Sequence, residues 1–205
     1  MQSGVDVRTQ ESIERLVRGA QQGDSDSFAG LYEAFYDKIY RYVMVKTSNV
    51  VDAEDITEEV FLRMLGSISS FGWKGYPFTS WLFRIAHNLV IDHYRKRGRQ
   101  KIVPLGDVDH TAGRSNYAMD EALDMKLSLR QVHRAMEDLS SLQREVITLR
   151  FAGGLSLRET AQMMGKKENA IKALQHAGIK KLRMLLVNQP FVAQNPTNQA
   201  LRLFG

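Results

Sequence analysis

Apolar side chains recur at three- and four-residue intervals along most of this chain, the spacing that places them on one face of an α-helix. The first stripe consists of Ile13, Leu16, Val17 and Ala20 and ends before Gly23. The second stripe is longer and partly aromatic, and its members are Phe28, Leu31, Tyr32, Phe35, Ile39, Tyr42 and Val43. Because no stretch alternates apolar and polar residues as a half-buried strand would, the pattern predicts an all-α protein.

Two more helices are predicted before residue 100. Asp52 is a typical N-cap residue for the first of them, and Gly66 is its expected end. The apolar face of that helix carries Ile56, Val60, Met64 and Leu65. A loop at residues 69–77 contains two glycines and one proline, and the next helix begins near Thr79. Its apolar positions are Trp81, Leu82, Ile85, Leu89 and Val90.

Helical periodicity disappears at residues 98–122, a polar segment with three glycines and one proline, which is typical of an interdomain linker. It resumes near Leu123 and includes Leu139, Leu142, Val146 and Leu149 before a double glycine. The sequence therefore predicts two small helical domains, at residues 11–97 and 123–187, joined by a flexible linker. Residues 188–205 are expected to form a frayed tail.

Residues 155–183 have the pattern of a helix-turn-helix. Ser156 and Glu159 form an S-x-x-E capping box, which defines the start of the first helix. A small residue, a turn glycine and two apolar anchors keep the spacing that this motif requires, and they are Ala161, Gly165, Ile171 and Leu174. Lysines occupy positions where DNA would lie. An ordinary helical hairpin with a solvated lysine face has the same pattern, so that alternative stays open.

The charge is unevenly distributed. The 205 residues carry a net charge of +5, and basic residues cluster at positions 95–101 and 166–183, whereas acidic residues cluster at 52–59. Two separate basic patches suggest two contacts on one nucleic acid. The acidic face, which includes Glu54, is either a solvated helix surface or a docking face for a basic surface on another protein.

Several function classes are disfavoured. The absence of cysteine excludes disulfides and cysteine zinc sites, which is compatible with a reducing cytoplasm. The first residues lack the apolar core of a signal peptide, and no run approaches membrane-spanning length, so we expect a soluble cytoplasmic protein without membrane insertion. His87 and His93 fall on different helix faces and make a poor metal pair. No nucleophile or phosphate loop accompanies Asp92, so we expect neither an enzyme nor a cofactor.

Residues 71–99 combine an aromatic-rich loop with a helix that ends in cationic side chains. Aromatic rings beside a cationic strip suit single-stranded nucleic acid, because an unstacked base needs a ring face or pocket and its phosphates need positive charge. Trp81, Phe83 and Phe78 are more simply explained as core residues. Trp73, Lys74 and Tyr76 lie in the loop and are the better contact candidates; the basic residues that follow are Arg95, Lys96, Arg97 and Arg99.

Four motifs in this order closely resemble a bacterial sigma factor: GDSDSFAGLYEAFYDKIYRYV, DAEDITEEVFLRML, FTSWLFRIAHNLVIDHYRKR and the helix-turn-helix. The two-domain form resembles the extracytoplasmic-function (ECF) group of the sigma-70 family, and the resemblance runs from about Leu16 to Leu185. It implies a dissociable subunit that directs RNA polymerase to promoters. The first predicted domain would be sigma region 2 and the second would be sigma region 4.

The resemblance also implies site residues. Those that would bind the β′ clamp helices of core polymerase are Asp55, Glu58, Glu59 and Phe61. Those that would recognise and melt the minus-ten element as single-stranded DNA are Phe71, Trp73, Lys74, Tyr76, Asn88, Asp92, Arg95 and Arg97. Those that would contact the minus-thirty-five duplex are Arg158, Lys166, Lys167, Asn169, Lys172 and His176.

The implied partners are core RNA polymerase, through the β′ clamp helices and the β flap, promoter DNA, and an anti-sigma protein. One departure from the family is Ala177-Gly178, where an arginine and an alanine are common. A glycine inside a helix costs about 1 kcal/mol relative to alanine, so we expect an interrupted recognition helix and weak DNA binding by region 4 alone. Two other interpretations remain, a free-standing helix-turn-helix regulator and a helical interaction module with incidental lysines.

Overall fold

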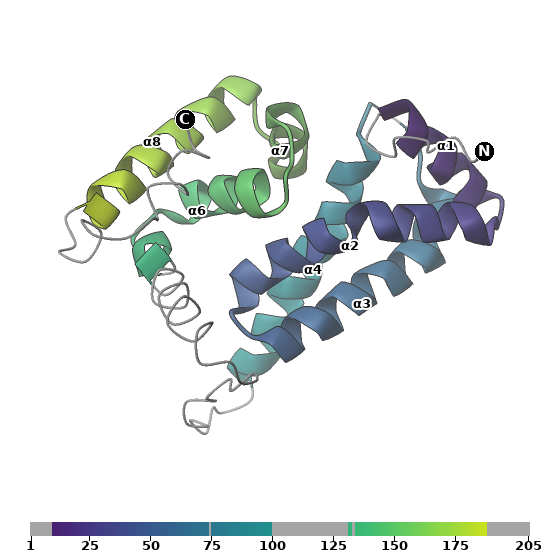
Figure 1. Ribbon diagram of the computed structural model, residues 1–205, viewed down its shortest axis with the longest axis horizontal. Helices are drawn as coiled ribbons and strands as arrows, with labels where there is room; N and C mark the ends of the chain where they lie inside the picture. Colours follow the sequence, from purple (N-terminus) through teal and green to yellow (C-terminus); the bar gives the residue numbers. More distant parts are fainter. Residues whose placement is uncertain (1–9, 74, 100–130, 133, 188–205) are drawn as a thin grey trace, which may run out of the picture. The chain divides into compact units, whose positions relative to one another are not determined.

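The computed structural model describes residues 10–73, 75–99, 131–132 and 134–187, and within these ranges the chain forms helices, turns and loops without any strand (Figure 1). The predicted all-α class is therefore confirmed. The helices are α1 (Gln10–Gln21), α2 (Ser25–Thr47), α3 (Val50–Ser67), η1 (Ile68–Ser70), α4 (Phe78–Arg99), α6 (Ser141–Ile147), η2 (Thr148–Ala152), α7 (Leu157–Met164) and α8 (Glu168–Val187). None of these described helices combines the length and the apolar character needed to cross a membrane.

The chain divides into two compact units. The first is Met1–Gln100 with Thr148–Ile171, and the second is Lys101–Ile147 with Lys172–Gly205. Apart from its first two positions, which are helical, the predicted linker at residues 98–122 lies outside the described residues. The start of the predicted second domain and the tail also lie outside them, so those two predictions are not tested.

Side-chain caps set the starts of α2 and α3. The Asp24 carboxylate accepts a hydrogen bond from the Ser27 amide at 3.1 Å, and this fixes the first turn of α2. At α3 the N-cap is Asn49, whose Oδ1 accepts from the Asp52 amide at 3.0 Å. The expected N-cap at Asp52 was therefore wrong by three residues, because an amide oxygen upstream serves the same purpose. Gly66 likewise does not end α3, which continues to Ser67.

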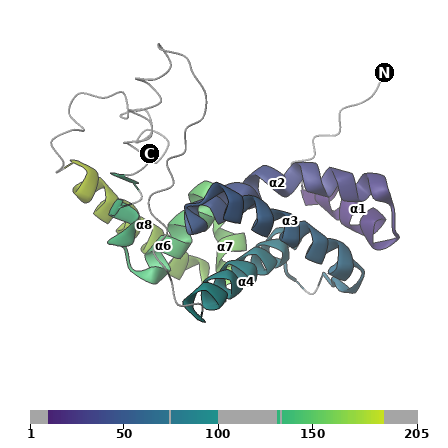
Figure 2. The same ribbon diagram turned by 90° about the horizontal axis from the view of Figure 1, so that it is seen from below.

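The core of the first unit is built around α2, which packs against α1, α3 and α4 (Figures 1 and 2). Its buried face places Phe35 edge-on to Phe78 at 5.6 Å between ring centroids, and Tyr42 edge-on to Phe83 at 5.4 Å. Such edge contacts between rings stabilise beyond simple burial by about 0.5–1.5 kcal/mol each. The other large, fully buried side chains of this core include Leu31, Ile39, Met64 and Leu82.

The same apolar cluster includes Leu149 of η2, Met163 of α7 and Leu155 from the segment between them. Ser80 on α4 donates a hydrogen bond to the Glu159 carbonyl oxygen at 3.1 Å. The five residues of η2 form a π-helical turn, and the Gly153 amide donates to the Thr148 carbonyl oxygen, five residues earlier, at 3.0 Å. A side chain has no room at Gly153, because an added Cβ would lie 2.7 Å from Cε1 of Phe83.

The second unit has a smaller core, made by Ala135, Met136, Leu139, Ile147 and Leu182. Arg144 on α6 donates to the carbonyl oxygens of Met136, Glu137 and Leu139 and so fastens the chain before α6 to that helix. Leu142, which the stripe placed on the apolar face, is 43% exposed.

Helix α8 is continuous through Gly178, so the expectation that Ala177-Gly178 interrupts it was wrong. Gly178 is buried, and an added Cβ would lie 3.1 Å from Cγ1 of Ile147. The glycine therefore lets Ile147 pack closely against α8. The predicted weakness of DNA binding by region 4 alone is not tested by this observation.

Replacing Gly153 with alanine is expected to destabilise the protein, whereas the same change at Gly66 is not. At Gly153 the new methyl group would overlap Phe83 and would lie 2.9 Å from the Leu149 carbonyl oxygen, so neighbouring groups must move, at a cost of about 1–3 kcal/mol. At Gly66 nothing lies within 4 Å of the new atom, and alanine favours helix by up to about 1 kcal/mol. Thermal unfolding followed by circular dichroism measures both. Equal melting temperatures for the two variants would contradict the close contact.

Candidate functional site

Helix α3 presents acidic side chains to solvent along the face opposite the core. Asp55 and Glu58 are exposed, and neither carboxylate has a cationic partner within the part of the chain that the structure describes. Glu59 accepts from Nε of Arg63 at 2.8 Å, one turn later on the same helix. The residues on the buried face of α3 are Ala53, Ile56, Thr57, Val60, Phe61 and Met64. This surface offers unpaired negative charge on a rigid support, which suits a basic partner.

Phe61 is not part of the exposed acidic face. It is 4% exposed, and its ring lies 4.6 Å from that of Tyr32 and 6.2 Å from that of Tyr36 between centroids. The expectation of direct partner contact at Phe61 is therefore corrected to a supporting position between α2 and α3. Its place in the apolar periodicity of the helix could have indicated this burial.

The loop between η1 and α4 has a buried end and an exposed end. Phe71 is 8% exposed and packs against Trp73, Phe78 and Trp81, so its ring has no free face for a base. The predicted DNA contact at Phe71 is corrected accordingly, because the ring is packed against other aromatic side chains. Tyr76 is 52% exposed at the other end of the loop. Trp73 is half-buried, and Lys74 lies outside the described residues.

The side chain of Gln21 on α1 fixes the path of this loop. Its amide nitrogen donates to the carbonyl oxygens of Ile68 at 3.1 Å and Phe71 at 2.7 Å. The rigid part of the loop is thus tied to a helix that lies fifty residues earlier in the sequence. Sequence reasoning missed Gln21, because nothing in a local pattern shows which backbone carbonyl a distant amide reaches.

Asn88 projects from α4 and is exposed. It lines a cavity of about 390 Å³ together with Ile85 and three residues at the end of α3, which are Arg63, Gly66 and Ser67. The cavity brings an amide and a guanidinium group together beside an apolar side chain. Those groups can hydrogen-bond the edge of a flat, polar ring. Arg63, Gly66 and Ser67 were not among the predicted site residues.

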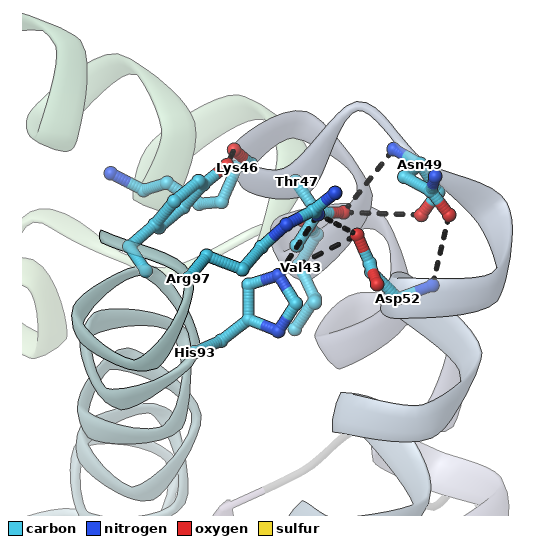
Figure 3. A network of polar contacts seen from close by, with 8 residues as sticks. Val43, Lys46, Thr47, Asn49, Asp52, His93 and Arg97 are labelled. Carbon is cyan, nitrogen blue, oxygen red and sulfur yellow. Dashed lines mark hydrogen bonds and ion pairs between the residues drawn. The ribbon is translucent and has the colours of Figure 1, made fainter. Parts of the chain in front are cut away.

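Two of the cations that end α4, Arg95 and Arg97, already have partners. Arg97 donates from Nη1 to Oδ2 of Asp52 at 2.7 Å, and Nε2 of His93 lies 3.5 Å from the same oxygen (Figure 3). The amide of Asp52 donates to Asn49, so one aspartate joins the N-terminus of α3 to the last turns of α4. Arg95 pairs with Asp92 at 2.9 Å. The Arg95 and Arg97 side chains are exposed, so their ion pairs contribute little stability.

A further contact ties the same end of α4 to α2. The Tyr94 hydroxyl donates to the Lys46 carbonyl oxygen near the C-terminus of α2. Burial raises the pKa of the Tyr94 phenol, Arg97 acts in the opposite direction, and Asp52 raises the pKa further. The hydroxyl is therefore a stable donor at neutral pH. With the Asp52 network, it holds the basic end of α4 to the remainder of the first unit.

The predicted helix-turn-helix is present, with its capping box formed. The Ser156 Oγ accepts from the Glu159 amide at 3.2 Å, and the Glu159 carboxylate accepts from the Ser156 amide at 2.7 Å. Gly165 ends α7 in the left-handed conformation, with φ of 63°. Ile171 is fully buried and anchors the start of α8. This local geometry confirms what the sequence predicted from spacing.

The concave side of this turn gathers four of the predicted duplex contacts. A cavity of about 530 Å³ is lined by Arg158, Lys166, Lys167 and Asn169, together with Ala161, Gln162 and Glu168. The remaining two predicted contacts, Lys172 and His176, are exposed further along α8. Positive charge therefore lies at the N-terminal end of an exposed helix, which is the arrangement that a recognition helix needs to reach phosphates and base edges.

Two protein-family models match the chain. One is described as Sigma-70 region 2 and matches residues 31–100, and the other is described as Sigma-70, region 4 and matches residues 135–184. The ECF RNA polymerase sigma factor BldN of Streptomyces coelicolor is 39% identical over 171 residues, which cover 83% of this chain and 64% of the relative. This chain thus matches less than two thirds of BldN. The ECF sigma factor SigX of Bacillus subtilis is 32% identical over 161 residues, covering 77% of this chain and 82% of SigX.

Solved structures share the fold. CnrH, in complex with the cytosolic domain of CnrY, gives a TM-score of 0.64 at 22% identity and covers 85% of this chain and 97% of its own. The sigma factor RpoE of Bartonella quintana, in complex with the anti-sigma factor NepR, gives a TM-score of 0.59 at 24% identity and covers 79% of this chain and 98% of its own. At these identities the likeness supports the fold.

The capping box gives a direct test of how α7 is positioned. Replacing Ser156 with alanine removes the acceptor for the Glu159 amide and is expected to destabilise the protein by about 0.5–2 kcal/mol. Replacing it with threonine keeps a hydroxyl at the same position and serves as the matched control. Thermal unfolding of both variants measures the effect. A melting temperature for S156A equal to that of the threonine variant would show that the cap does not hold α7.

Proposed function

Because this chain belongs to the ECF group of the sigma-70 family, we propose that it is a dissociable subunit of bacterial RNA polymerase that directs initiation at specific promoters. The observation that carries this proposal is the presence of region 2 and region 4 in one chain and in that order. A free-standing regulator would need only the helix-turn-helix and would have no use for region 2. The chain would have no reaction of its own, because the polymerase supplies the catalysis.

In this proposal the acidic face of α3 binds the clamp helices of the β′ subunit. Asp55 and Glu58 are free to pair with cations of the partner. Glu59 can leave its pair with Arg63 and bind a cation of the partner instead. Phe61 contributes by holding the helix against α2. Such contacts would set both the orientation and the association rate, since complementary charge steers the encounter of two proteins.

We propose that the loop before α4 and the helix itself read the minus-ten element as single-stranded DNA. Tyr76 and Trp73, with Lys74, would contact the strand, and Phe71 would keep the loop in place. The cavity beside Asn88 would receive an extruded base, and Asp92 follows four residues later on α4. Arg95 and Arg97 would exchange their carboxylate partners for backbone phosphates; this exchange is inexpensive because exposed ion pairs are weak.

The helix-turn-helix would read the minus-thirty-five element in duplex form. Lys166, Lys167 and Asn169 sit at the N-terminus of α8, with Arg158 on the same concave surface. Lys172 and His176 extend this face toward the adjacent phosphates. Splitting recognition between two regions raises the effective concentration of the second contact once the first has formed, so neither needs to bind tightly alone.

The proposed partners are core polymerase, through the β′ clamp helices and the β flap, and promoter DNA. An anti-sigma protein is also proposed, since RpoE of Bartonella quintana was solved with one. In this role the protein would act in the cytoplasm, associated with the nucleoid through RNA polymerase, and would need no cofactor. The domain bounds proposed for these tasks are residues 11–97 for region 2 and 123–187 for region 4, with a linker at 98–122.

Reversing charge on the acidic face should abolish initiation without unfolding the protein. The double variant Asp55→Lys, Glu58→Lys is expected to lose at least ten-fold in affinity for purified core polymerase, because it sets like charges against a basic partner. Glu11→Lys on α1 is the control, with the same kind of reversal away from α3. Affinity is measured by fluorescence anisotropy of the labelled full-length chain, and activity by in vitro transcription. Unchanged core binding by the double variant would contradict the proposal.

Two substitutions on the helix-turn-helix should have different signatures. Lys167→Ala is expected to weaken binding of the holoenzyme to all promoters alike. It should also reduce the slope of log affinity against log salt concentration by about one, as expected for the loss of one phosphate contact. Asn169→Ala is expected to relax base preference at one position by about 1–3 kcal/mol. Promoter titrations at several salt concentrations, with single-base variants of the minus-thirty-five element, measure both. Identical signatures for the two variants would argue against a recognition helix at this position.

A further inference from the structure

A row of tyrosines lies along α2 beside the acidic face of α3. The rings of Tyr32 and Tyr36 are 5.1 Å apart between centroids, and those of Tyr36 and Tyr40 are 6.2 Å apart and nearly parallel, with 7° between their planes. Phe61 of α3 lies against the first two rings and is itself buried. The row therefore has a fixed backing, and its outer side faces solvent, with Tyr32 38% exposed.

The hydroxyls of the three tyrosines are available to a partner. Within the described residues, no hydrogen bond satisfies the hydroxyl of Tyr32, Tyr36 or Tyr40. Elsewhere on α2 the chain does place cations over rings, with Lys38 over Phe35 at 5.2 Å and Lys46 over Tyr42 at 5.8 Å. The described part of the chain supplies no such cation to the tyrosine row.

The row is also in a negative field. Burial raises the pKa of the Tyr36 phenol, and so do Tyr32 and the carboxylates of Glu54 and Glu58 on α3. Both glutamates are exposed. A ring face attracts a cation through its quadrupole, and a carboxylate beside the ring adds direct charge attraction and hydrogen-bond acceptors. A planar guanidinium suits this pair of features best, because it can stack on a ring while donating to a carboxylate in its own plane.

We propose that the row of Tyr32, Tyr36 and Tyr40, with Glu54 and Glu58, is a receptor for an arginine side chain presented by core RNA polymerase. This inference rests on the proposed docking of α3 and extends that surface across to α2. The partner would bind at the junction of the two helices, with the arginine stacked on the tyrosine row. Helix α2 would then contribute recognition as well as core packing.

The test compares phenylalanine with leucine at the same position. In the full-length chain, Tyr36→Phe keeps the ring face and should bind core polymerase within about two-fold of the unchanged protein, whereas Tyr36→Leu keeps apolar bulk but loses the ring and should bind roughly three- to thirty-fold more weakly. Tyr32→Phe and Tyr32→Leu repeat the comparison at a more exposed position, in case Tyr36→Leu unfolds. Circular dichroism and melting temperature verify the fold of each variant.

Three outcomes would overturn the inference. Leucine variants that bind as tightly as the phenylalanine variants would show that the rings do not receive a cation. Equal losses for phenylalanine and leucine would assign the contact to the hydroxyl instead. Normal binding by every tyrosine variant, together with loss in the Asp55→Lys, Glu58→Lys variant, would leave the docking of α3 standing without α2. If that double variant binds core polymerase normally, the docking of α3 itself is wrong, and this result differs from each of the three above.

Discussion

The packing of aromatic rings on the inner face of α2 is the contact on which the rest of the first unit depends. Phe35 and Tyr42 engage Phe78 and Phe83 of α4, and this pairing sets how far α4 can move relative to α2. With the inner positions of α2 committed to the core, the helical repeat turns Tyr36 and its neighbours outward. One helix thus provides both a rigid interior and an ordered outer surface. Packing in that interior positions the acidic residues of α3 and the loop before α4.

Charged groups at the ends of the helices are organised differently from the core. Arg95 and Arg97 at the end of α4 are held by Asp92 and Asp52, yet both arginines are exposed to solvent, where an ion pair contributes between about 0 and 1 kcal/mol. These pairs orient the arginines, because Asp92 holds Arg95 along α4 and Asp52 holds Arg97 toward the start of α3. A polyanion can replace the carboxylates without loss of a strong interaction. The side chains that would contact DNA are in this way ordered before DNA arrives.

The sequence was sufficient to predict those features whose residues lie close together along the chain. The capping box of Ser156 and Glu159 and the turn at Gly165 lie within ten residues of one another, and their geometry follows from local rules. The burial of Phe71 and the pairing of Arg97 with Asp52 could not be predicted in this way, because each depends on partners from another helix. Composition and charge indicated which segments carry the candidate surfaces. They did not separate side chains that face a partner from those that support the surface.

The π-helical turn of η2 has an implication for how this part of the chain can change in evolution. A π turn closes its hydrogen bonds over five residues where an α turn uses four, so it holds one residue more than a regular helix would. Deleting a single residue within Thr148–Ala152 could restore an α turn, while the chain on either side keeps its ends. Chain length is therefore adjustable just before the helix-turn-helix, and the close contact at Gly153 is the constraint that such a deletion must preserve.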